Sequence, residues 1–206
     1  MSSETSREKI LNKIRKALAT PVPLPFTGMP AEPGFYHAPK DDLDIIFAEA
    51  FIKLQGKFAY CANEAELHQQ LQHLITAKEW MKIYCNDSRW NEQYSNTIAL
   101  ESCDASITGC EVLVARTGSI VLSSAEESGR TVSVYAPVHI CIAYANQLVY
   151  DIKDALSLLK EKYAGNIPSF ITCATGPSRT ADIEKTLVTG VHGPKEVYLF
   201  LVDKKN

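Results

Sequence analysis

The stretch CATGPSRTADIE, residues 173–184, combines residue types that bind small anions. It follows an apolar run at residues 170–173 that is long enough for a buried strand, and Gly176-Pro177 then forces a turn. The residues from Thr180 onward are small, polar or acidic, as in the first turn of a helix. A strand, a tight glycine turn and a helix start would together present free backbone N–H groups to an anion.

Three side chains in this turn could hold the ligand. Ser178 and Thr180 are hydroxyl donors, and Arg179 carries a planar guanidinium that suits a carboxylate or a phosphate. The alternative role for Arg179 is a structural ion pair with Asp182 or Glu184. We expect ligand contact because hydroxyl donors flank the arginine. The turn does not identify the ligand.

Two histidines are candidates for general acid–base catalysis on a hydroxy acid. His192 lies in a second glycine–proline turn, GVHGP at residues 190–194, and is hard to explain as a core residue. His139 follows a proline inside an apolar run, and a core histidine satisfied by the backbone explains it equally well. These two histidines could meet in space, but no third ligand is indicated, so we expect no metal site.

The remaining candidates are glycines and their neighbours. Thr117-Gly118 could present backbone donors to an anion, or could form a β-bulge or a tight strand connection. Together with the two glycine–proline turns they complete the expected ligand-binding set, which is Thr117, Gly118, Gly176, Pro177, Ser178, Arg179, Thr180 and Gly193.

The composition narrows the class of protein. The 206 residues are enough for one sizeable domain, or one domain with an appendage, and 46% hydrophobic with 22% charged residues is ordinary for a globular protein. A net charge of -3 argues against non-specific binding of nucleic acid. No apolar run approaches the ~20 residues that cross a bilayer, and the polar N-terminus is no secretory signal, so we expect the cytoplasm. The six cysteines form no C-x-x-C pair, which favours buried, reduced thiols.

We expect two parts in the chain. Residues 1–40 contain a short basic amphipathic helix at residues 5–19, with a capping box from Thr5 to Glu8, and then a proline-rich arm. Such a helix is marginal alone and should dock, either on its own domain or on a partner or second subunit. Residues 41–206 form the main domain.

The main domain alternates helical and strand patterns. Helices are expected at residues 41–55, after Asn63 and after Asp151. Strand patterns between and after them supply about seven strands, from the apolar runs at residues 58–61, 80–85, 112–115, 119–123, 131–135, 138–144, 168–173 and 195–203. This pattern predicts a three-layer α/β domain with a mostly parallel sheet flanked by helices. Ligands of such sheets collect beyond the carboxyl ends of the strands, so we expect the turn at 176–180 and residues 137–139 there.

Five motifs together resemble one family. They are ARTGSIVL at 115–122, GRTVS at 129–133, APVHI at 136–140, GPSRTADIE at 176–184 and VHGPKEV at 191–197. The combination resembles the LUD domain family, and within it the lactate utilization protein C branch, over residues 40–203. One departure is Arg116, where many relatives carry an acidic residue before the Thr-Gly.

The resemblance implies a fold similar to the sugar-phosphate isomerase and coenzyme A transferase group. It implies a cytoplasmic subunit that works with an iron–sulfur partner and a cysteine-rich partner to oxidise L-lactate to pyruvate, with no cofactor in this chain. Coenzyme A transferases of this fold group use a strand-borne glutamate, but no matching glycine motif surrounds Glu111. Two alternatives stay open: a stand-alone enzyme acting on a phosphorylated sugar or an acyl-thioester, and a non-catalytic adaptor.

Overall fold

The computed structural model describes residues 5–19, 39–94, 97–180 and 188–203. The chain divides into two compact units, Met1–Ala38 and Pro39–Asn206, and each is described by itself. Of the residues described, none belongs to a helix that is both long enough and apolar enough to cross a bilayer.

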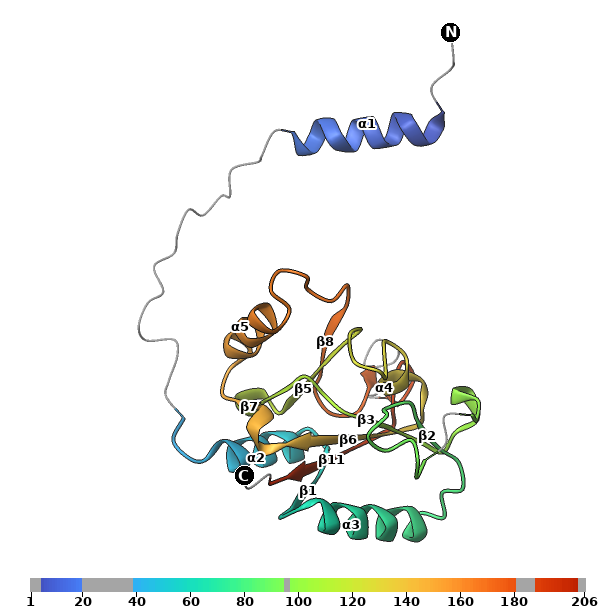
Figure 1. Ribbon diagram of the computed structural model, residues 1–206, viewed down its shortest axis with the longest axis vertical. Helices are drawn as coiled ribbons and strands as arrows, with labels where there is room; N and C mark the ends of the chain where they lie inside the picture. Colours follow the sequence, from blue (N-terminus) through green and yellow to red (C-terminus); the bar gives the residue numbers. More distant parts are fainter. Residues whose placement is uncertain (1–4, 20–38, 95–96, 181–187, 204–206) are drawn as a thin grey trace. The chain divides into compact units, whose positions relative to one another are not determined.

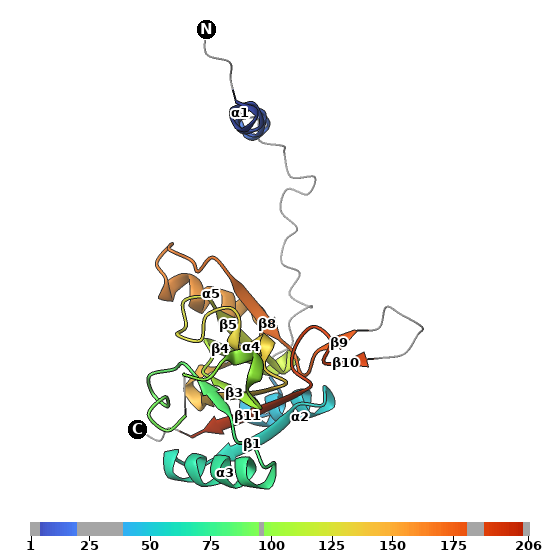
Figure 2. The same cartoon turned by 90° about the vertical axis from the view of Figure 1, so that its right-hand side faces the viewer.

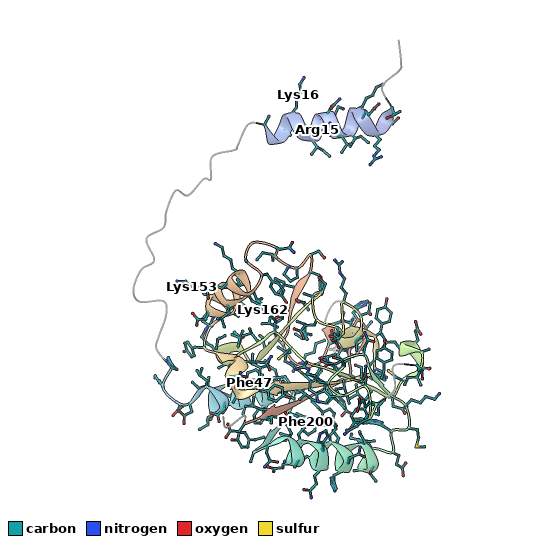
Figure 3. The ribbon with its side chains drawn as sticks, viewed as in Figure 1. Arg15, Lys16, Phe47, Lys153, Lys162 and Phe200 are labelled. Carbon is teal, nitrogen blue, oxygen red and sulfur yellow. The ribbon has the colours of Figure 1, made fainter. Side chains whose placement is uncertain are left out.

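The described part of the first unit is helix α1 (Ser6–Leu18). Its expected capping box is present, because the Thr5 hydroxyl accepts a bond from the Glu8 N–H and the Glu8 carboxylate accepts one from the Thr5 N–H. Arg15 and Lys16 lie in the last turn, where positive charge complements the helix dipole, and both are labelled in Figure 3.

A parallel five-stranded sheet forms the centre of the second unit (Figure 1). Its strand order is β1-β11-β6-β3-β2, and every neighbouring pair is parallel. The strands are β1 (Lys57–Cys61), β2 (Ile83–Cys85), β3 (Ala105–Thr108), β6 (Val138–Tyr144) and β11 (Glu196–Val202). The central strands are nearly all apolar because both faces of the sheet are covered.

A second, four-stranded sheet has the order β7-β4-β5-β8. Its strands are β4 (Val112–Val114), β5 (Ser119–Ser123), β7 (Leu148–Val149) and β8 (Ile171–Ala174). β4 and β5 are antiparallel because only the 3-10 turn η2 (Ala115–Thr117) and Gly118 join them, and a connection this short cannot return a strand in parallel. These strands therefore form a separate sheet, and the central sheet is parallel and flanked by helices, in agreement with the predicted fold class.

Helices cover both sheets. α3 (Glu64–Ala77) packs on one face of the central sheet, and α2 (Leu43–Lys53) packs with the second sheet on the other face. α5 (Ile152–Lys162) packs on the outer face of the second sheet. Figure 3 labels Phe47 and Phe200, one from each of the two large core clusters that this layering buries.

Two expected elements differ in the structure. Residues 131–135, predicted as a strand, form the short helix α4 (Val132–Tyr135), which Ser106 of β3 fixes by donating a hydrogen bond of 2.8 Å to the Val132 carbonyl. Arg179–Thr180, expected at the start of a helix, forms strand β9 and pairs antiparallel with β10 (Val188–Thr189). The two short strands project from the body in Figure 2. Asp182 and Glu184 lie outside the described residues.

A buried carboxylate fastens α5 to the second sheet. The Glu111 carboxylate accepts bonds from the Ser123 hydroxyl at 2.5 Å, the Tyr163 hydroxyl at 2.6 Å and the Lys162 ammonium at 2.6 Å. Burial by itself would raise the pKa of Glu111, but the three donors outweigh it and the pKa is lowered. Glu111 is thus a fully bonded structural anion.

Replacing Glu111 by Gln should destabilise the fold by about 1 to 3 kcal/mol, because two charge-assisted bonds weaken and one acceptor oxygen becomes a donor. Urea unfolding measures the change. Glu161→Gln, an exposed position on the same helix, is the matched control and should change stability by less than about 0.5 kcal/mol. Equal stabilities of the two variants would contradict the structural role of Glu111.

Candidate functional site

Residues of three chain segments line an open cavity of about 620 Å³. They are residues 101–103, 134–137 and 190–195, and they lead directly into β3, β6 and β11. These three strands are adjacent and parallel in the central sheet, so their amino ends lie side by side. We call this the amino-edge cavity.

Two basic side chains line the amino-edge cavity. Lys195 and His192 both line it and are both exposed, so their side chains are open to a solute. The Lys195 N–H donates a 2.8 Å bond to the Pro137 carbonyl, which fixes the backbone of this lysine at the start of β11. A lysine and a histidine beside a glycine-rich turn can bind a carboxylate and exchange a proton with it.

The two glycine–proline turns support each other. The Ser178 N–H donates to the Pro194 carbonyl at 3.0 Å, and the Gly190 N–H donates to the Ser178 carbonyl at 2.9 Å. A Cβ on Gly193 would lie 3.0 Å from the Cβ of Ser178, so glycine permits this close contact. The first turn therefore positions the second. The second turn, which includes His192, lines the cavity.

Two other predicted site residues, Gly118 and Gly176, form the seat of helix α2. Gly118 has φ +61°, and a Cβ there would lie 2.7 Å from the Phe51 backbone nitrogen. Gly176 has φ +77°, and a Cβ there would lie 2.7 Å from the Leu54 carbonyl oxygen. Both positions need glycine for the backbone conformation and for the close approach of the helix.

Arg179 also contacts this end of α2. Its guanidinium donates a hydrogen bond to the Leu54 carbonyl, one of the carbonyls that a helix end leaves unpaired. The side chain is otherwise exposed, and Pro177 in the same turn is buried. The structure thus gives Arg179 a capping contact in addition to the ligand role that the sequence suggests.

Thr117 begins a short chain of hydroxyl groups. Its Oγ1 lies 2.8 Å from Ser119 Oγ, which lies 2.9 Å from Thr175 Oγ1. This chain ties the η2 turn to the residue before Gly176. Thr180, the last of the predicted ligand residues, stands opposite Val188 in the β9–β10 ladder.

His139 is buried between the two sheets, with 1% of its surface exposed. Thr108 Oγ1 donates to the Gly109 carbonyl, so it must accept from His139 Nε2, which lies 2.8 Å away. This assigns the proton to Nε2 and leaves Nδ1 an acceptor without a partner among the described residues. Burial lowers the pKa of His139 from 6.5 to about 4, which keeps the ring neutral.

The candidate residues lie at the edge of the sheet opposite to the one we expected. Val138 is the first residue of β6 and Glu196 the first of β11, so residues 137–139 and the turns at 176–180 and 190–194 gather at the amino ends. The expectation of the carboxyl ends was wrong for the central sheet, because residues 137–139 begin β6 and the turn at 190–194 leads into β11. The turn at 176–180 follows β8 of the second sheet and reaches the same edge through its bond to Pro194.

The carboxyl edge of the central sheet carries polar side chains that bond to each other. Asp87 holds Arg89 through two bonds of 2.8 and 2.6 Å. The Tyr60 hydroxyl donates to Asp203 at 2.9 Å. These pairs use their charges and hydroxyls within the protein.

Several lining residues were not foreseen. Lys195, Tyr135 and Glu101 all contribute to the cavity. Lys195 could have been found, since it directly follows a glycine–proline turn and precedes the last strand. Tyr135 gave no such signal, because its segment looked like a strand.

The unusual Arg116 has a structural partner. Its Nε donates a 2.5 Å bond to Asp151, the residue that caps the start of α5. Among the residues that the structure describes, no group of three or more histidine, cysteine or carboxylate side chains could hold a metal ion.

The geometry defines an α/β protein with a parallel central sheet and a cavity of about 620 Å³ at its amino edge. The LUD domain profile matches residues 76–202, more than half of the chain. The chain belongs to the LUD domain family.

Curated relatives give further likeness. A lactate utilization protein C from Bacillus licheniformis is 38% identical over 140 residues, which cover 65% of this chain and 58% of that protein. A lactate utilization protein C from Anoxybacillus flavithermus is 27% identical over 98% of this chain and its own full length. The crystal structure of a DUF162 family protein from Deinococcus radiodurans has a TM-score of 0.56 at 19% identity, covering 78% of this chain and 96% of its own, and supports the fold.

The seat of α2 predicts a specific cost at Gly118. Gly118→Ala would force an alanine into a left-handed backbone conformation and against the α2 backbone. It should therefore lower the free energy of unfolding by about 3 kcal/mol or more. Gly129 has φ +62°, and no atom lies within 4 Å of the position that a Cβ would take there. Gly129→Ala should therefore lower the free energy of unfolding only by the backbone strain, about 1 kcal/mol. Urea unfolding compares the two. Equal losses would show that α2 does not press on Gly118.

The neutral His139 predicts a pH dependence. Its folded pKa lies below the unfolded value, so the unfolded chain binds more protons and stability falls as pH drops from about 6.5 to about 4. His139→Gln removes this term, so the stability gap between wild type and variant should narrow by about 3 kcal/mol over that range. Exposed His73→Gln should not reproduce the effect. A gap that stays constant with pH would contradict a buried neutral imidazole.

Proposed function

We propose that this chain binds a small hydroxy or keto carboxylate, such as L-lactate or pyruvate, in the amino-edge cavity. The observation that carries the proposal is the meeting of Lys195, His192 and the turn at 190–193 at the amino ends of three central strands. The relatives named lactate utilization protein C support this choice of substrate. The two glycine–proline turns serve as the scaffold of the site.

The cavity residues suit the two polar ends of lactate. Lys195 would neutralise the carboxylate, and backbone N–H groups of residues 191–193 would add donors. His192 would accept the proton of the C2 hydroxyl as that carbon is oxidised. His139 is not among the described residues that line the cavity, and its buried position suits a structural role.

The oxidation of lactate to pyruvate also removes the C2 hydrogen and two electrons, and this part of the proposal assigns both to acceptors on the partner proteins. The chain would act as a cytoplasmic accessory subunit beside an iron–sulfur protein and a cysteine-rich protein. Five of its six cysteines are buried and all six are free, which suits thiols that bind no cluster. Purified alone, the protein should be colourless.

Lys195→Gln tests the proposal directly. It should weaken L-lactate binding about tenfold or more, because the carboxylate loses its charged partner. Calorimetric titration measures the affinity, and unfolding in urea confirms that the variant is folded. Lys160→Gln, an exposed lysine on α5, is the control and should bind as wild type does.

Other outcomes point elsewhere. Loss of binding in a stably folded Arg179→Ala variant would move the anion site to the first glycine–proline turn, whereas loss of stability alone fits the contact with Leu54. Turnover of a sugar phosphate or acyl-thioester without partners would favour a stand-alone enzyme. No binding of any carboxylate by folded protein would favour an adaptor.

A further inference from the structure

The rim of the amino-edge cavity is unusually apolar for an exposed surface. Val134 and Tyr135 of α4 are 40% and 63% exposed, and Val191 of the facing turn is 54% exposed. These three side chains come from two segments that lie more than 50 residues apart in the sequence, yet they line one cavity. Large exposed apolar side chains that converge on a cavity mark a surface that is covered in function.

The cavity is also large for its expected ligand. About 620 Å³ lies within the range of pockets that hold drug-sized molecules, roughly 300 to 1,000 Å³. A three-carbon acid such as lactate would use Lys195 and His192 and would leave the apolar rim in water. The polar groups fix one end of a ligand. The lining also contains the Glu101 carboxylate, and its apolar side chains, chiefly Val134, Tyr135 and Val191, offer contact to a longer body.

The rim residues have no evident structural reason to be apolar. Tyr135 ends helix α4, where a polar residue would be tolerated, and the fold holds this helix through Val132, which is buried. Val191 lies in a turn whose backbone is fixed by its neighbours Gly190 and Pro194. Neither exposed side chain is needed to bury the core, which leaves ligand contact as their use.

We propose that the amino-edge cavity takes 2-hydroxy or 2-oxo carboxylates that carry an apolar or aromatic side chain. The carboxylate lies at Lys195 and His192, and the side chain of the acid packs on Val134, Tyr135 and Val191. This inference rests on the proposed function and names the substrate class of the same site. It makes lactate the smallest member of the class rather than the best fit.

The test is a calorimetric titration of the full chain with lactate, 2-hydroxybutyrate, 2-hydroxyhexanoate and 3-phenyllactate. Burial of a methylene contributes about 0.8 kcal/mol, so affinity should rise up to about fourfold per added carbon. Val134→Ser and Tyr135→Ser, both on α4 and outside the turn that holds the carboxylate, should flatten this rise and leave lactate affinity nearly unchanged. Met81→Ser, which removes an apolar side chain that is 88% exposed elsewhere, is the control and should keep the full rise.

The outcomes separate the two proposals. If lactate binds and affinity does not rise along the series, this inference is wrong and the proposed function stands. If the rise is unchanged in both rim variants, the apolar contact is elsewhere and the inference is also overturned. If none of the four acids binds to folded protein, the proposed function fails, and the inference fails with it.

Discussion

The parallel pairing of β6 with β11 is the interaction on which the rest of the structure depends. The two strands pair over seven residues, from Val138 opposite Glu196 to Tyr144 opposite Val202. The ladder continues beyond the strands, because the Lys195 N–H donates to the Pro137 carbonyl. This extension holds the segments that precede β6 and β11, residues 134–137 and 190–195, side by side. Without it the amino-edge cavity would have no common wall.

Close packing against helix α2 explains why several residues of the family motifs are glycine. Gly118 and Gly176 lie 58 positions apart in the sequence, yet both stand against the C-terminal part of α2. Arg179 donates to the same helix end. Sequence motifs rich in glycine suggest ligand loops, but here several of their members serve to seat a helix. The proposed chemistry is left to side chains of the neighbouring turn, chiefly His192 and Lys195.

The sequence predicts elements whose pattern is local. Helices α2 and α3 and strands β6 and β11 follow from apolar periodicity and from the Asn63 cap, which does accept a bond from the Glu66 N–H. The division into two sheets does not follow, because the pairing of β5 with β8 joins strands about 50 residues apart and nothing local encodes it.

The candidate site could be predicted only in part. The second glycine–proline turn and His192 were found because a histidine beside glycines is rarely a core residue. Tyr135 and Glu101 were not found, because they meet the turn only through the order β11-β6-β3. The edge of the sheet was predicted wrongly for the same reason, since whether a turn enters or leaves a strand depends on where the strand begins.

The central claim is that the site lies at the amino edge of the parallel sheet. The most direct measurement is an amide NMR titration of the full chain with L-lactate. The account predicts saturable shifts at Gly190, His192, Gly193 and Lys195, with the amides of Asn86 to Arg89 and Gly109 unchanged at the carboxyl edge. Shifts confined to that carboxyl edge would contradict the account and return the site to the usual position for open α/β sheets.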